Sequence, residues 1–104
     1  MIQIKIGFGG GKFMLEALGH AGYAEENDIV CAGVSAISYA LYGFLLNSKE
    51  HVEKWYDVED QVGKMRLLVK GDAYLIPAFH MAAIGFLQIE KEYPENVKVD
   101  LIKP

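Results

Sequence analysis

The stretch DIVCAGVSAISYALYGFLL, residues 28 to 46, decides the fold because it contains the longest uncharged run of the chain. The 18 residues from 29 to 46 suit a buried helix and also approach the shortest length of a membrane span. Two serines, two glycines and two tyrosines dilute the apolar character of this run, and no second span is obvious. We therefore expect a buried helix and no membrane partner.

The start of this helix carries the candidate chemistry. Asp28 stands where a helix N-cap is expected, which places Cys31, the only cysteine, in the first turn. Free amide protons and the helix dipole favour a thiolate there and can hold the oxyanion of a tetrahedral intermediate. His20 is expected at the end of the preceding strand, from which it can act as the base toward the thiol.

Each of these residues also has a purely structural interpretation. A lone cysteine in an apolar helix is more often a small core residue than a nucleophile. His20 can simply end a strand, Asp28 can be only a cap, and helical serines such as Ser35 usually bond their own backbone. The position of Cys31 at a helix start, after a polar loop that contains glycine, favours catalysis.

Outward from this helix, the hydrophobic pattern predicts an α+β fold in the order ββαββαβ, a small and mostly antiparallel sheet with two apolar helices. The expected strands cover residues 2–8, 12–19, 51–60, 64–71 and 97–102, and the second helix lies within 72–93. Pro77 lacks an amide proton, so the regular helix is expected to start at about that residue or to kink there. The length predicts a single domain, residues 1–104.

Both helices are apolar nearly all round, so each is expected to be covered on more than one side. One small subunit has little material for this, which favours a homodimer. A stripe of small residues in the first helix, namely Ala32, Ala36, Ala40 and Gly43, allows another backbone to approach closely.

Composition narrows the function classes. A net charge of −4 argues against binding by phosphate neutralisation, so we expect no direct nucleic-acid partner. One cysteine cannot form an internal disulfide, and the N-terminus lacks a secretion signal, which together point to the cytoplasm. One cysteine and three scattered histidines offer no metal-ligand spacing, so we expect no metal and no other cofactor.

Three further features have simple expected roles. The glycines of GFGGGKF, residues 7 to 13, do not fit a phosphate-binding loop, and we expect them to form a mobile hairpin turn or a flap near the site. His51 is expected in a loop. His80 is expected to be a satisfied histidine of the core.

The stretch GHAGYAEENDIVCAGVSAI, residues 19 to 37, resembles the signature of the ribosomal-processing cysteine protease family, Prp. The resemblance implies His20 as the general base and Cys31 as the nucleophile, with supporting roles for Asp28 and Ser35. It also implies a homodimer with a mobile loop over the site. The implied reaction removes a short N-terminal extension, next to paired phenylalanines, from the precursor of a bacterial large-subunit ribosomal protein.

The sequence departs from the family pattern in the loop between His20 and Asp28. This loop is one residue shorter than usual, and EEN, residues 25 to 27, stands where a glycine commonly precedes the aspartate. The departure affects substrate fit more than the type of reaction.

Rival functions remain at this point. The chain can be a non-catalytic module that binds a ribosomal or phage protein, with Cys31 buried. It can also be the same protease acting on a phage capsid or scaffold precursor. A redox thiol protein would need a resolving cysteine, which this chain does not supply.

Overall fold

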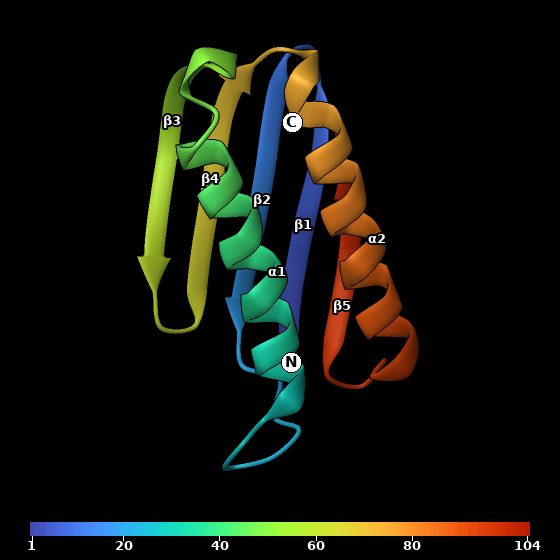
Figure 1. Ribbon diagram of the computed structural model, residues 1–104. Helices are drawn as coiled ribbons and strands as arrows, with labels where there is room; N and C mark the ends of the chain where they lie inside the picture. The colour runs from blue at the N-terminus through green and yellow to red at the C-terminus, as the bar shows by residue number, and fades with distance from the viewer.

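We describe the protein from a computed structural model that covers residues 1–104 (Figure 1). The predicted order ββαββαβ and the α+β class are confirmed. The elements are β1 Ile2–Gly9, β2 Lys12–Gly19, α1 Ile29–Leu46, the 3-10 helix η1 Lys49–His51, β3 Val52–Gln61, β4 Lys64–Gly71, the 3-10 helix η2 Ala73–Leu75, α2 Ile76–Glu92 and β5 Val97–Ile102.

The five strands form one sheet in the order β3-β4-β2-β1-β5. All neighbouring pairs are antiparallel except β1 and β5, which run parallel. The sheet is therefore mostly antiparallel, as predicted.

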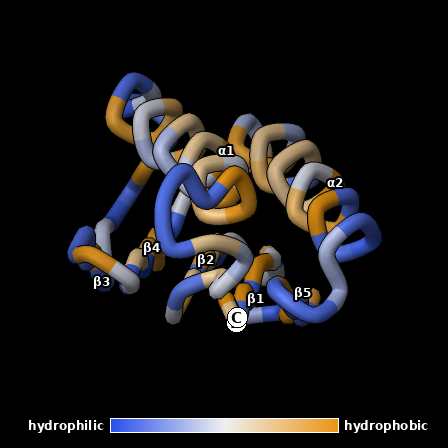
Figure 2. The backbone as a smooth tube through the Cα atoms, turned by 90° about the horizontal axis from the view of Figure 1, so that it is seen from below, coloured by the Kyte–Doolittle hydropathy of each residue, from blue (hydrophilic) through white to orange (hydrophobic).

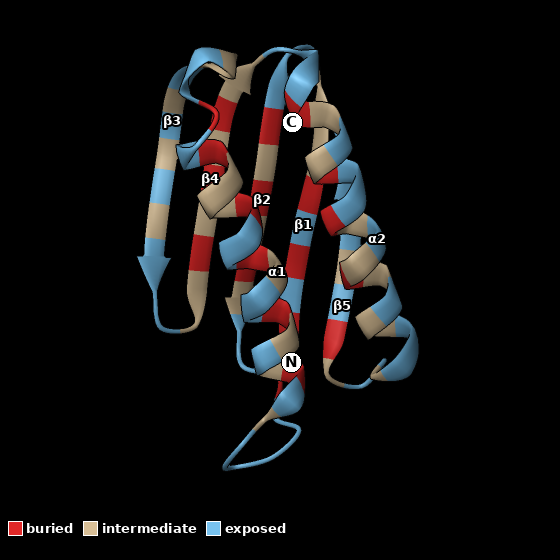
Figure 3. Ribbon diagram, in the orientation of Figure 1, coloured by how far each residue is buried: buried red, intermediate tan, exposed pale blue.

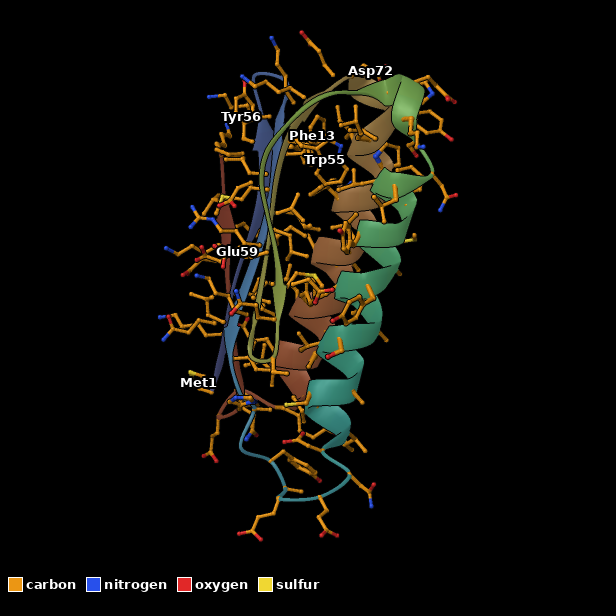
Figure 4. All side chains as sticks on the ribbon, turned by 90° about the vertical axis from the view of Figure 1, so that its left-hand side faces the viewer. Met1, Phe13, Trp55, Tyr56, Glu59 and Asp72 are labelled. Atoms are coloured by element: carbon orange, nitrogen blue, oxygen red, sulfur yellow. The ribbon has the colours of Figure 1, made fainter.

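Alternation along the strands gives the sheet one apolar face. In β1, Ile2, Ile4 and Ile6 are buried, whereas Gln3 and Lys5 on the other face are exposed. The same alternation buries Phe13, Leu15 and Ala17 of β2 and Met65, Leu67 and Val69 of β4. Both helices cover this apolar face (Figure 2). Figure 4 shows Phe13 and Trp55 pointing between the sheet and the helices, whereas Glu59 lies on the opposite side of the sheet.

The two helices lie side by side and each buries one stripe, which Figure 3 shows in red. In α1 the buried stripe consists of Val30, Val34, Ser38, Leu41 and Leu45. Each helix was expected to be covered on more than one side. Within this subunit the sheet and the neighbouring helix provide the only cover. The outward sides, including Met81 and Ile84 of α2, are exposed.

By length and composition alone, two helical stretches, Ile29–Leu46 and Ala73–Glu92, could cross a membrane. The sequence suggested only the first of them. Core helices of soluble proteins meet the same criterion, and here both helices pack their buried stripes on the sheet.

The sheet has two ends, and they differ in what they bring together. At one end the register pairs Ile2 with Gly19 and Leu18 with Lys64, and α1 begins over it (Figure 1). We call this the Ile2 end. At the other, the Gly10 end, β1 turns into β2 between Gly9 and Lys12.

Candidate active site

Asp28 caps α1 and also holds the loop that precedes the helix. Its Oδ1 accepts the backbone N–H groups of Val30 and Cys31, both at 3.0 Å, so the predicted cap is confirmed. Its Oδ2 accepts the N–H groups of Tyr23 at 3.1 Å and Ala24 at 3.4 Å. These donors, the Cys31 amide most strongly, hold the pKa of the Asp28 carboxyl below its ordinary value of 3.8.

Cys31 lies in the first turn of α1 and is half-buried. Its Sγ accepts the backbone N–H of Ala21 at 3.3 Å. The expectation that the first-turn amides hold an oxyanion is wrong for Val30 and Cys31, because Asp28 already takes both of these N–H groups. The amide that faces the sulfur comes instead from the residue after His20.

His20 follows β2 directly and is exposed. Its ring lies against Gly63 in the turn between β3 and β4. His20 and Cys31 line the same pocket, which has a volume of about 330 Å³. No hydrogen bond joins the two side chains, although both line this one pocket.

Ser35 also lines this pocket, one helical turn after Cys31, and its side chain is exposed. Its neighbour Ser38 behaves as helical serines usually do, because its buried Oγ donates to the carbonyl of Val34 at 2.7 Å. All four residues that the sequence singled out, His20, Asp28, Cys31 and Ser35, therefore lie at the Ile2 end of the sheet.

The loop from His20 to Asp28 is anchored by residues that sequence reasoning missed. Asn96 donates its Nδ2 hydrogen to the carbonyl of Ala21 at 2.9 Å. The rings of Tyr23 and Tyr93 meet edge to face, with centroids 5.2 Å apart. The sequence feature that could have revealed these anchors is the YPEN segment, residues 93 to 96, which supplies both of them and precedes β5.

The loop takes a left-handed backbone conformation just before the cap. Asn27 has a φ of 51°, a region that favours glycine and that asparagine tolerates better than most residues. The asparagine of EEN therefore adopts a backbone conformation that glycine would also adopt readily. The departure from the family pattern leaves the cap intact.

The β3–β4 hairpin forms a second wall of the pocket. Its residues Asp60, Gln61, Val62, Gly63 and Lys64 line the pocket together with Tyr39 of α1. The hydroxyl of Tyr39 donates to Asp60 Oδ1 at 2.6 Å, and this hydrogen bond raises the pKa of Tyr39. No pattern in the sequence indicates this contact, because it joins residues from different elements.

The glycine-rich hairpin between β1 and β2 is not near the site, so the expectation of a flap there is wrong. Gly10 and Gly11 turn the chain at the Gly10 end, whereas Cys31 lies over the Ile2 end (Figure 1). Strand direction explains the error, since the turn and the end of β2 are separated by the full length of the strand. The turn beside the site is the one between β3 and β4.

The other two histidines lie outside the site. His51 is in η1, and its Nδ1 is 2.9 Å from Asp72 Oδ2, while its ring stacks on Tyr74. His80 is exposed on α2, so the expectation of a core histidine is wrong. No group of three or more His, Cys, Asp or Glu side chains is placed to hold a metal ion.

Comparison with protein families gives one match. The model of the family described as cysteine protease Prp matches residues 1–98. Among curated proteins, none matches this chain.

Solved structures with the same fold cover nearly the whole chain. The ribosomal processing protease Prp from Staphylococcus aureus, in complex with a covalently linked product peptide, has a TM-score of 0.75 and 23% identity, covering 98% of this chain and 100% of that one. The protein SMU.848 from Streptococcus mutans has a TM-score of 0.73 and 24% identity, covering 100% of this chain and 96% of that one. The S. aureus protease with a substrate peptide has a TM-score of 0.69 and 22% identity, covering 98% and 100%. These likenesses establish the fold.

Proposed function

Because this chain belongs to the cysteine protease Prp family, we propose that it is an endopeptidase that removes the short N-terminal extension of a bacterial large-subunit ribosomal protein. One observation carries the proposal. Cys31, at the start of α1, and His20, at the end of β2, line the same pocket.

The proposed mechanism uses Cys31 as nucleophile and His20 as general base and acid. The Cys31 thiolate attacks the scissile carbonyl carbon, and the imidazolium of His20 then gives its proton to the departing amine. A thioester remains on Cys31. Water attacks this thioester while His20 takes one of its protons. The Cys31 thiolate is expelled and so regenerated, and the carboxylic acid product releases the second proton to solvent as it leaves as a carboxylate. The Ala21 N–H beside the sulfur supports the charged form of the nucleophile.

Asp28 acts in this mechanism by holding parts together rather than by contacting substrate. Its four amide contacts fix the start of α1, which carries Cys31, to the loop that begins with His20. Ser35 faces the pocket one turn beyond Cys31, where it can contact bound peptide.

The pocket lining supports an apolar substrate segment. Ile2, Ala17, Val34 and Met65 contribute apolar surface, and Val62 at the tip of the β3–β4 hairpin is 94% exposed. The S. aureus protease that shares this fold is a ribosomal processing enzyme and binds a substrate peptide. The lining favours an apolar segment at the cut, and the shared fold favours a ribosomal protein precursor; the paired phenylalanines come from the family resemblance.

The test is direct cleavage of that precursor. The protein is incubated with the ribosomal protein carrying its extension, and the products are weighed by mass spectrometry. We expect a single cut beside the paired phenylalanines, lost when those residues become alanine. Rapid alkylation of Cys31 without a cut would support a protease that acts on another precursor, such as a phage capsid protein. If neither cleavage nor alkylation occurs, the non-catalytic binding module becomes the favoured function.

We also propose that the protein works as a homodimer in the reducing cytoplasm, where Cys31 stays a free thiol. The outward side of α1 carries the small residues Ala32, Ala36 and Ala40, all exposed, and no charge. Beside it, an apolar groove of about 800 Å³ runs between α1 and α2. A second copy of this chain is the occupant that we propose for this surface.

Light scattering tests the dimer. At micromolar concentration we expect twice the subunit mass of 11.6 kDa. Ala36→Glu should give the subunit mass, and Lys5→Glu on the open sheet face serves as the control that leaves the dimer intact. A subunit mass for the unaltered protein contradicts the proposal.

A further inference from the structure

The turn between β3 and β4 touches the candidate base directly. A methyl group placed on Gly63 would lie 3.0 Å from Nε2 and 3.2 Å from Cε1 of His20. Contacts this short are tighter than ordinary van der Waals contact, so the edge of the imidazole rests on the bare α-carbon of Gly63. A side chain at this position would require the His20 ring to shift by a few tenths of an ångström.

The same turn is fixed to the strand that leads to His20. The N–H of Gly19 donates to the carbonyl of Gly63 at 2.8 Å. The residue before His20 and the residue beneath its ring are therefore joined by a backbone hydrogen bond. The imidazole cannot move away from the turn without rotating about its own side-chain bonds.

The hairpin is fixed on its other side to the helix that carries the nucleophile. Tyr39 follows Cys31 by two helical turns, and its hydroxyl holds Asp60 at 2.6 Å. Asp60 stands next to Gln61, the last residue of β3 before the turn. Both contacts line the pocket that contains Cys31 and His20.

These contacts form a closed ring around the pocket. It runs from Cys31 along α1 to Tyr39, across to Asp60, through the turn to Gly63, and on to His20. The N–H of Ala21 on Cys31 Sγ then closes the ring. We propose that the β3–β4 turn positions the catalytic base, with Gly63 as the seat of the His20 ring and the Tyr39–Asp60 hydrogen bond holding that seat to α1.

The seat has a physical purpose. His20 is exposed, and no carboxylate fixes its ring, so without Gly63 the imidazole would sample several rotamers. Misplacement of a catalytic group by about 1 Å costs roughly 100-fold in rate. A turn that leaves one position open for the ring therefore raises the fraction of molecules ready to react.

The first experiment compares Gly63→Ala with Gly11→Ala. Gly11 is the matched control, because it lies in the other two-residue hairpin turn with a φ of +78° against +75° for Gly63. A methyl group on Gly11 would meet only the carbonyl of Gly71 at 3.6 Å, an ordinary contact. Both variants therefore carry the same backbone strain, and only Gly63→Ala disturbs His20.

We expect both variants to lose similar stability toward urea. Gly63→Ala should lower kcat at least tenfold with KM little changed, and it should slow alkylation of Cys31 by iodoacetamide toward the rate of His20→Ala. Gly11→Ala should retain at least half of both rates. Equal rates in the two variants would overturn the proposal.

The kinetic comparison rests on the proposed protease, so NMR supplies an independent measurement. In the unaltered protein we expect nuclear Overhauser contacts between the His20 ring protons and the α-protons of Gly63. Gly63→Ala should shift the His20 ring resonances, and Gly11→Ala should leave them in place. Absence of the contact, or unshifted ring resonances in Gly63→Ala, would overturn the proposal even if the protein cleaves its precursor. If the contact is seen and no cleavage occurs, the proposed position of His20 on Gly63 is supported and the proposed substrate is contradicted.

The hydrogen bond to α1 is tested by its two partners. Tyr39→Phe removes only the hydroxyl, and Asp60→Ala removes the acceptor. Each should lower kcat severalfold, while Asp60→Asn, which keeps an acceptor oxygen, should recover most of the loss. Tyr56→Phe, at an exposed tyrosine on the edge strand, is the control. Full activity in Tyr39→Phe and Asp60→Ala would show that this hydrogen bond does not help to position His20.

Discussion

Each end of the sheet has a histidine and an aspartate, and the two pairs are built differently. At the Gly10 end, His51 is 2.9 Å from Asp72, and its ring stacks on Tyr74 with centroids 3.8 Å apart. At the Ile2 end, the carboxylate oxygens of Asp28 accept four backbone N–H groups. His20 lies against Gly63 and lines the same pocket as Cys31.

The histidine at the Gly10 end has fixed side-chain partners, and the histidine at the Ile2 end is the one that the proposed mechanism uses. His51 is partnered on its edge and on its face, and it joins η1 to the turn before α2. His20 has no carboxylate partner, and its ring lies against Gly63 in the pocket that also contains Cys31. The Ile2 end thus places an imidazole and a helix-start cysteine in one pocket, which is the combination that the proposed mechanism uses.

The largest effect is expected at Cys31. Cys31→Ala and Cys31→Ser should abolish cleavage, because the thioester cannot form. The fold should survive, since a small residue replaces another small residue in a half-buried position. Product masses and the midpoint of thermal unfolding measure the two effects. Normal turnover in Cys31→Ala would exclude the mechanism.

The two histidines should respond in opposite ways. His20→Ala should lower kcat by roughly 10²- to 10⁴-fold, the usual contribution of a general acid–base, with little loss of stability. His51→Ala should leave kcat nearly unchanged and lower the unfolding midpoint, because it removes the imidazole that bonds to Asp72 and stacks on Tyr74. A similar loss of activity in both variants would remove the distinction between the two ends.

Asp28 should affect both stability and activity. Asp28→Ala removes the acceptor for four amides, so the start of α1 and the loop after His20 should both loosen. Asp28→Asn keeps one acceptor oxygen for Val30 and Cys31, but its NH₂ group cannot accept from Tyr23 and Ala24. Asparagine should therefore recover stability more than activity. Full activity in Asp28→Ala would separate the residue from the site.

Acid should weaken the Gly10 end through Asp72. The hydrogen bond from His51 holds the pKa of Asp72 below its ordinary value of 3.8. The folded state therefore binds the proton less readily than the unfolded state, so this stabilisation is complete above pH 3.8 and is lost as pH falls through the lowered pKa. Urea unfolding between pH 6 and pH 3 should show a shallower acid loss in Asp72→Asn than in the unaltered protein. Equal slopes would contradict the assignment.

The smallest effect is expected at Asn27. Asn27→Gly should stabilise the protein by less than about 1 kcal/mol, because glycine adopts the left-handed region more readily. Asn27→Ala should destabilise it, and cleavage should follow the order Gly, Asn, Ala. A gain in stability with alanine would show that the backbone conformation is not what selects this residue.

Local features could be predicted from the sequence, because they depend on near neighbours. The bounds of α1, the Asp28 cap and the turn at Val62 and Gly63 all follow from short-range patterns. The resemblance over residues 19–37 selected His20, Cys31 and Ser35, which line one pocket, and Asp28, which caps the helix that carries Cys31.

Features that depend on tertiary packing could not be predicted. The exposure of His80 depends on how α2 is rotated about its axis on the sheet. An apolar helix does not show in its sequence which side faces solvent. The place of the Gly10 turn depends on strand direction across the sheet. The seat at Gly63 and the Tyr39–Asp60 contact join residues from separate elements, so no spacing in the sequence points to them.

The most direct test of the account is the mass of the protein during its first turnovers. The reaction with precursor is quenched in acid, and the chain is digested and weighed. We predict an adduct equal to the released extension minus water on the peptide that contains Cys31, absent in Cys31→Ala. Cleavage that continues in Cys31→Ala, with no acyl group on Cys31 of the unaltered protein, would contradict the account.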